Sequence, residues 1–95
     1  MGELEELRER IAGIDAQLIE LVAERTKLAE RVIAAKRREG SPIKDEEQEE
    51  EVLRRAVMLA VERGLDPSLT RELFRVLIEM SVERQRGFMG DGNLP

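Results

Sequence analysis

The chain has 95 residues, of which 41% are hydrophobic and only 2% aromatic, and its formal net charge is −5 at pH 7. It contains neither cysteine nor histidine, which excludes a disulfide framework, a thiolate metal site and the most frequent general base. The acidic balance argues against a sequence-independent nucleic-acid binder, and no stretch approaches the about 20 apolar residues of a membrane span. We therefore expect a single all-α domain over residues 1–95 that is cytoplasmic and has no metal site.

The first expected helix covers about residues 3–39, contains no proline and ends at Gly40-Ser41-Pro42. An apolar seam runs along it in alternating steps of three and four residues, which is the spacing that places one face of a long helix against other helices. More apolar residues flank the seam and widen this face. The seam comprises Leu4, Leu7, Ile11, Ile14, Leu18, Leu21, Leu28, Val32 and Ala35, and its flanks are Ile19, Val22, Ala29, Ile33 and Ala34.

Arg25 occupies the one charged position of this seam. Because a buried, unpaired charge costs several kcal/mol, an anion is expected to meet it, either a protein carboxylate such as Asp15 or Glu49 or a carboxylate of a ligand. Lys36 lies three turns later and only about 20° away around the helix, so that both side chains can converge on one ligand. Taken alone, Lys36 is also compatible with an ordinary surface lysine.

A second helix is expected over about residues 45–63. Asp45 can cap its N-terminus, with Gln48 three residues later as in a capping box. Glu49 lies one turn after Asp45 on the inner side, although both acids also suit an ordinary first helical turn. The inner side of this helix comprises Val52, Leu53, Ala56, Val57 and Ala60.

A third helix is expected over about residues 67–88, because Asp66-Pro67 supplies an N-cap followed by a proline at the first helical position. Residues 89–95 have turn chemistry and are expected to be flexible. Ser81 and Gln85 lie one turn apart on the inner face. Three interpretations of this pair stay open: a hydrogen-bonded core pair, a device that sets the dimer register, or part of a site. That face comprises Leu73, Phe74, Leu77, Ile78, Ser81 and Gln85.

The length of the first helix predicts a homodimer. It would be roughly 55 Å long, against roughly 30 Å for each of the others, so the two short helices cannot cover it. Packing the long helices of two copies together solves this problem. Arg8 is about 25 Å from Arg25 along the axis and cannot readily reach the same ligand within one chain. In an antiparallel dimer it can reach the partner's Arg25–Lys36 region, whereas alone it would be a solvated charge.

Together these polar residues suggest a receptor for a small dicarboxylate between helices. Several segments carry a family resemblance: Leu7-Arg8-Glu9-Arg10-Ile11, Ile14-Asp15-Ala16-Gln17-Leu18, Leu21-Val22-Ala23-Glu24-Arg25, Ala35-Lys36, Pro42-Ile43-Lys44-Asp45, Leu73-Phe74 and Ile78-Glu79-Met80-Ser81-Val82-Glu83-Arg84-Gln85. Through them the chain strongly resembles the all-α chorismate mutases, from about residue 4 to residue 88 without a gap. That family forms an intertwined helical homodimer in which an arginine from the partner completes each site.

The resemblance implies a cofactor-independent conversion of chorismate to prephenate, within one molecule, for phenylalanine and tyrosine synthesis. By analogy, Arg25 and the partner's Arg8 would clamp the two substrate carboxylates, and Ser81 would support one of them. Lys36 and Gln85 would donate hydrogen bonds to the breaking ether oxygen.

The resemblance further implies that Glu49 accepts a hydrogen bond from the ring hydroxyl, assisted by the backbone near Asp45. The family often has an arginine where this chain has Gln48, which puts substrate affinity in doubt. Two alternatives stay open: an isochorismate pyruvate lyase of the same fold, against which Glu49 and Asp45 argue, and a non-catalytic helical interaction module.

The pocket walls are expected to be Val32, Val52, Ile78 and Val82.

Overall fold

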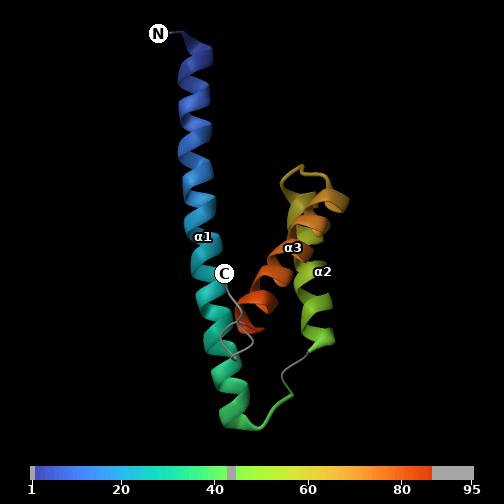
Figure 1. Cartoon of the computed structure of the whole chain (residues 1–95). Helices are drawn as coiled ribbons and strands as arrows, with labels where there is room; N and C mark the ends of the chain where they lie inside the picture. Colours follow the sequence, from blue (N-terminus) through green and yellow to red (C-terminus); the bar gives the residue numbers. More distant parts are fainter. Residues whose placement is uncertain (1, 43–44, 87–95) are drawn as a thin grey trace.

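The structure, a computed structural model, describes residues 2–42 and 45–86. This part of the chain forms three α-helices and no strand: α1 (Glu3–Glu39), α2 (Glu46–Glu62) and α3 (Pro67–Arg86). α1 is a long rod, and α2 and α3 form a helical hairpin beside its C-terminal half (Figure 1). The expected all-α class with one very long helix is therefore confirmed.

The expected end of the third helix at residue 88 and the expected flexible tail, residues 89–95, fall outside the described residues. For residues 84–86 the structure describes the backbone alone. Within the described residues, no helix combines the length and the apolar composition that are needed to cross a membrane.

Aspartates cap the N-termini of both short helices. The carboxylate of Asp45 accepts a hydrogen bond from the backbone N–H of Gln48 at 3.0 Å, and that of Asp66 accepts one from the N–H of Leu69 at 2.9 Å. Each carboxylate thereby satisfies an amide that has no partner inside its helix. These contacts join residues only three positions apart, so they can form before any tertiary packing exists.

Asp66→Ala is expected to lower the free energy of unfolding by about 1 kcal/mol, because the first turn of α3 loses its cap. Urea unfolding followed by circular dichroism, at one fixed protein concentration, measures this loss. Asp66→Asn, which keeps the acceptor oxygen, serves as the control and should unfold close to the wild type. A loss of the same size in both variants would show that the carboxylate charge, not the cap, is what matters.

Glycines end α1 and α2. Gly40 and Gly64 have φ values of 70° and 72°, in the left-handed region where a side chain would be strained. In both places the amide that follows the glycine returns to a carbonyl of the last turn, that of Lys36 at 2.9 Å and that of Ala60 at 2.8 Å. The end of α1 is thus well defined, and Lys36 lies in its last turn.

The core of the described chain is small. α3 packs against both α2 and α1 and so holds the hairpin to the long helix. The buried apolar side chains are Ile33 of α1 and Leu53, Ala56 and Ala60 of α2, and Ser81 of α3 is buried with them. Such a core is meagre for a chain of this length, because stability comes mainly from removing apolar surface from water.

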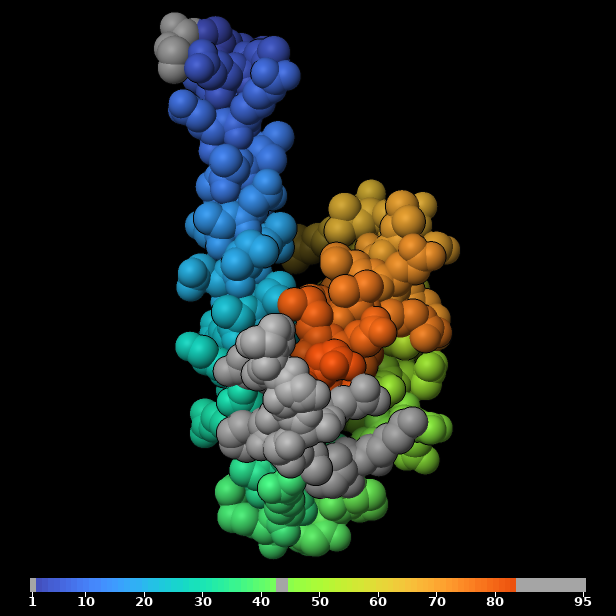
Figure 2. Space-filling view, viewed as in Figure 1, coloured from blue at the N-terminus to red at the C-terminus, as the bar shows by residue number. Residues whose placement is uncertain are grey.

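The apolar seam of α1 stays exposed in the single chain. All residues from 2 to 21 are exposed, and Leu18, toward the end of this stretch, keeps 53% of its surface. Figure 2 shows the N-terminal half of α1 standing clear of the hairpin. Nearer the C-terminus of α1, Arg25 bonds to Leu77 and Ser81 of α3. On the flank of the seam, Ile33 is buried and Val22 and Ala29 are half-buried. An apolar stripe of this length in water is typical of an interaction surface.

Candidate functional site

An open cavity of about 300 Å³ is lined by residues of α1 and α3 and of the start of α2. This volume is at the lower end of the range for small-molecule sites. α1 and α3 contribute its apolar wall and its cations, and the first turn of α2 contributes carboxylates. The lining residues are Arg25, Leu28, Ala29, Val32, Lys36, Asp45, Gln48, Glu49, Ile78, Ser81 and Val82.

Five of the seven site residues expected from the sequence meet in this cavity: Arg25, Lys36, Asp45, Glu49 and Ser81. They come from three helices and span more than half of the chain. Neither helical spacing nor a shared turn requires such a meeting. The hairpin brings them together by laying α3 against α1 and turning the start of α2 toward the end of α1.

The other two expected residues are not among the described residues that line the cavity. Arg8 is exposed on the free half of α1, about 25 Å along the helix axis from Arg25. Gln85 belongs to α3, one turn after Ser81, and its side chain lies outside what the structure describes. The described lining of the cavity in one chain therefore does not include Arg8 or Gln85.

Arg25 bonds to neutral groups of α3. Its Nη1 donates to the carbonyl of Leu77 at 3.4 Å and to the hydroxyl of Ser81 at 3.3 Å, and the Ser81 hydroxyl donates to the same carbonyl at 3.2 Å. Among the described residues, neither Asp15 nor Glu49 is its hydrogen-bond partner. The described partners of Arg25 are therefore neutral groups, and a carboxylate partner stays a prediction from the sequence.

Among the described residues, the formal charges of the cavity lining cancel. Arg25 and Lys36 on α1 contribute two positive charges, and Asp45 and Glu49 at the start of α2 contribute two negative ones. The Asp45 carboxylate is also engaged in capping α2. Opposite charges on opposite walls orient a ligand, with its anionic groups toward α1 and its hydroxyl donors toward α2.

The expected apolar wall is only partly right. Val32, Ile78 and Val82 line the cavity, whereas Val52 is half-buried on α2 and is not among the lining residues. α1 supplies the missing wall through Leu28 and Ala29, which lie three and four positions after Arg25. That spacing places them on the same helix face as Arg25, so it could have identified them from the sequence.

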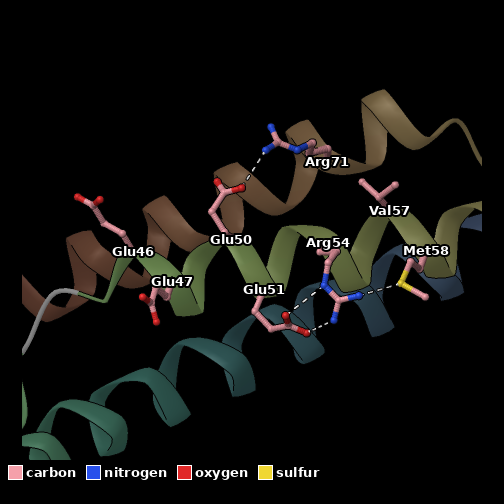
Figure 3. A pocket seen from close by; sticks show the side chains of 8 residues that line it. All are labelled: Glu46, Glu47, Glu50, Glu51, Arg54, Val57, Met58 and Arg71. Carbon is pink, nitrogen blue, oxygen red and sulfur yellow. Dashed lines mark hydrogen bonds and ion pairs between the residues drawn. The ribbon is translucent and has the colours of Figure 1, made fainter.

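A larger hollow, of about 670 Å³, lies along α2 and extends to α3 (Figure 3). Its charged side chains pair with one another: Arg54 binds Glu51, and Arg71 binds Glu50 at 3.4 Å. The hydrogen bond from Arg54 lowers the pKa of Glu51. No group of three or more potential metal-binding side chains occurs in the described parts of the chain. Four of the eight residues around the hollow are glutamates, so it does not suit an anionic ligand.

Comparison with known proteins agrees with the geometry. The family model of chorismate mutase type II matches residues 7–86. A chorismate mutase of Methanocaldococcus jannaschii is 33% identical over 87 residues, which cover 92% of this chain and 88% of that protein.

Longer proteins match as well. The bifunctional chorismate mutase/prephenate dehydratase of Escherichia coli K12 is 36% identical over 83 residues, and the corresponding protein of Buchnera aphidicola subsp. Schizaphis graminum is 31% identical over 97. These matches cover 87% and 98% of this chain but only 22% and 25% of the relatives. Because the family model covers nearly all of the three helices, and a relative of similar length matches over most of both chains, this chain belongs to the chorismate mutase type II family.

Proposed function

We propose that this protein converts chorismate to prephenate and so serves phenylalanine and tyrosine synthesis in the cytoplasm. The observation that carries the proposal is the meeting of Arg25, Lys36, Asp45, Glu49 and Ser81 around one cavity of suitable size. Membership of the chorismate mutase type II family supports it. Two of these side chains are cations, as a substrate with two carboxylates requires.

The reaction needs no nucleophile, proton shuttle or cofactor. One C–O bond of the ether breaks while one C–C bond forms within the same molecule, and no group leaves. The protein contributes by holding the substrate in a folded conformation and by stabilising negative charge that develops on the ether oxygen. Lys36 and Gln85 are the proposed donors to that oxygen. Lys36 is suitably placed because it lines the cavity from the last turn of α1.

The charge balance of the cavity supports a contribution from a second copy. The described lining residues of one chain have no net formal charge, whereas the substrate carries two negative charges. We propose a homodimer in which the partner's Arg8 supplies a further cation, so that it and Arg25 each bind one carboxylate. Glu49, with Asp45 beside it, would accept the hydrogen bond of the ring hydroxyl. The exposed seam of α1 is the proposed contact between the copies.

Leu18→Glu is expected to abolish the dimer, because it places a carboxylate in the middle of the exposed seam. Sedimentation velocity measures the change of mass, and circular dichroism measures the helix that remains. Gln17→Glu is the matched control, since it adds the same charge one residue away from the seam and should remain dimeric. A dimeric Leu18→Glu protein would rule out the seam as the interface.

Turnover is expected to vary little between about pH 6 and pH 8, because the amide of Gln85 donates a hydrogen bond without first being protonated. Measuring kcat across this range tests the assignment. Gln85→Glu is the informative variant, since a glutamic acid donates only when protonated and its turnover should rise toward acid. A wild-type rate that rises steeply toward acid would contradict the role of Gln85.

Product identification by NMR tests the proposed function directly. The purified protein is mixed with chorismate and, in a separate sample, with isochorismate. Prephenate is the expected product. Salicylate and pyruvate from isochorismate, without prephenate from chorismate, would assign the protein as an isochorismate pyruvate lyase instead. A folded dimer that converts neither compound would favour the non-catalytic interaction module.

A further inference from the structure

We propose that Arg71 is a positioning residue, which holds the start of α2 through Glu50 and so keeps Glu49 at the cavity. The inference rests on the proposed function, in which Glu49 accepts the hydrogen bond of the substrate's ring hydroxyl. Arg71 itself lies on α3, lines the neighbouring hollow and is not among the residues that line the cavity.

The first two turns of α2 form a partition between the cavity and the hollow. Glu49 lines the cavity on one side, and Glu50 lines the hollow on the other (Figure 3). Glu49 is only half-buried, and the first buried residue of α2 is Leu53, which is 3% exposed. The start of α2 therefore extends beyond the packed core, and burial holds it less firmly than the rest of the helix.

This start of α2 is also strongly acidic. Six of the seven residues from position 45 to position 51 carry carboxylates, and three pairs of these acids are four positions apart. Like charges at that spacing on a helix repel each other. The helix dipole offsets part of the repulsion, and cations from outside the first turns offset more of it. The six acids are Asp45, Glu46, Glu47, Glu49, Glu50 and Glu51.

Two arginines pair with these acids and differ in what they hold. Arg54 binds Glu51 within α2, so this pair does not fix the helix against another element. Arg71 binds Glu50 at 3.4 Å and thereby joins α3 to α2 (Figure 3). Because α3 also packs against α1, the Arg71–Glu50 pair helps to fix the acidic wall of the cavity relative to its cationic wall.

Loss of the pair is expected to affect substrate binding more than the chemical step. Glu49 and Glu50 are adjacent in α2, so a shift of its first turns moves both side chains. In the proposed mechanism the ring hydroxyl bonds to Glu49 in the substrate and in the transition state alike, so a misplaced Glu49 raises KM. The side chains of Arg71 and Glu50 keep 37% and 68% of their surface, so solvent screens the pair and limits the effect to a few-fold.

A double-mutant cycle tests the proposal. Arg71→Ala is expected to raise the KM for chorismate about threefold, with kcat within about twofold of the wild-type value. In the Glu50→Ala background the same change should alter KM by less than about 1.5-fold, because the carboxylate through which Arg71 acts is absent. Arg71→Lys, which keeps the charge, should restore most of the affinity. About 0.5 M NaCl should bring the KM values of Arg71→Ala and the wild type close together, because it screens an exposed pair.

Arg75→Ala is the matched control. Arg75 is exposed on α3, one turn after Arg71, and lines neither the cavity nor the hollow, so its loss should leave KM unchanged. Equal increases of KM in the two variants would overturn the proposal, since a general loss of positive charge would explain them. An unchanged KM in Arg71→Ala, or the same increase in both backgrounds of the cycle, would overturn it as well.

Amide hydrogen exchange followed by NMR tests the same contact without any turnover. Exchange at residues 49–52 is expected to be a few-fold faster in Arg71→Ala than in the wild type and in Arg75→Ala, whereas exchange at residues 56–60 should not change. Faster exchange in both segments, or in neither, would overturn the positioning role. If the wild type forms no prephenate, the proposed function fails, and this measurement still decides whether Arg71 holds the start of α2.

Discussion

An equimolar mixture of the Arg8→Ala and Arg25→Ala variants, allowed to exchange chains, is expected to recover roughly a quarter of the wild-type activity, although each variant alone is nearly inactive. In the proposed dimer, each site combines Arg25 of one chain with the partner's Arg8. A hybrid dimer therefore contains one site with both arginines and one site with neither. Random assortment makes about half of the dimers hybrids, and each hybrid has one of its two sites intact.

The two variants must be refolded together, or produced together with different tags, so that hybrids form. Activity measured before and after this step, with the hybrid fraction determined by mass spectrometry, gives the result. Arg10→Ala is a suitable control in place of Arg8→Ala, because Arg10 is also an exposed arginine on the same half of α1. A confirmed hybrid without recovery, or an active Arg8→Ala homodimer, would show that Arg8 does not complete the partner's site.

Lys36→Ala is expected to lower kcat by about 10²- to 10³-fold, the usual effect of removing a donor that stabilises charge in the transition state. Its substrate KM should change less, because the ether oxygen carries much more charge in the transition state than in the ground state. Steady-state kinetics with chorismate, monitored at several concentrations, separates the two parameters.

Lys27→Ala is the matched control for this change. Lys27 lies on the same helix, is exposed and does not line the cavity, so its loss should leave turnover unchanged. Urea unfolding of both variants distinguishes chemistry from folding. If Lys36→Ala destabilised the protein strongly while kcat stayed at the wild-type value, Lys36 would be a structural residue of the α1 C-terminus and not a donor to the substrate.

Several features of the site were predictable because they depend on one helix alone. Arg25 and Lys36 are eleven residues apart, and helical geometry requires that they lie on nearly the same side. Asp45 and Glu49 similarly share the first turn of α2. The pairing of these two sets in one cavity was inferred from the family resemblance, since spacing within a helix says nothing about which helices meet.

Other features were not accessible in this way. Leu73 was expected on the inner face of α3, yet it is 55% exposed in the single chain. α3 packs against both α1 and α2. Leu73 lies at the edge of the apolar face expected for α3, and this packing does not cover it. Likewise, the Arg25–Ser81 hydrogen bond joins residues 56 positions apart. No local pattern distinguishes this neutral partner from the carboxylate that a lone cation on an apolar face suggested.

The sequence by itself determined the three helices, the starts of α2 and α3 and the ends of α1 and α2, because apolar periodicity, the caps at Asp45 and Asp66 and the glycines at positions 40 and 64 act within a few residues. Only the tertiary structure decided that Ile33, on the flank of the α1 seam, is buried while the leucines of the seam stay exposed. That choice depends on how three helices with broad apolar faces share their contacts, which is a property of packing and not of any one segment.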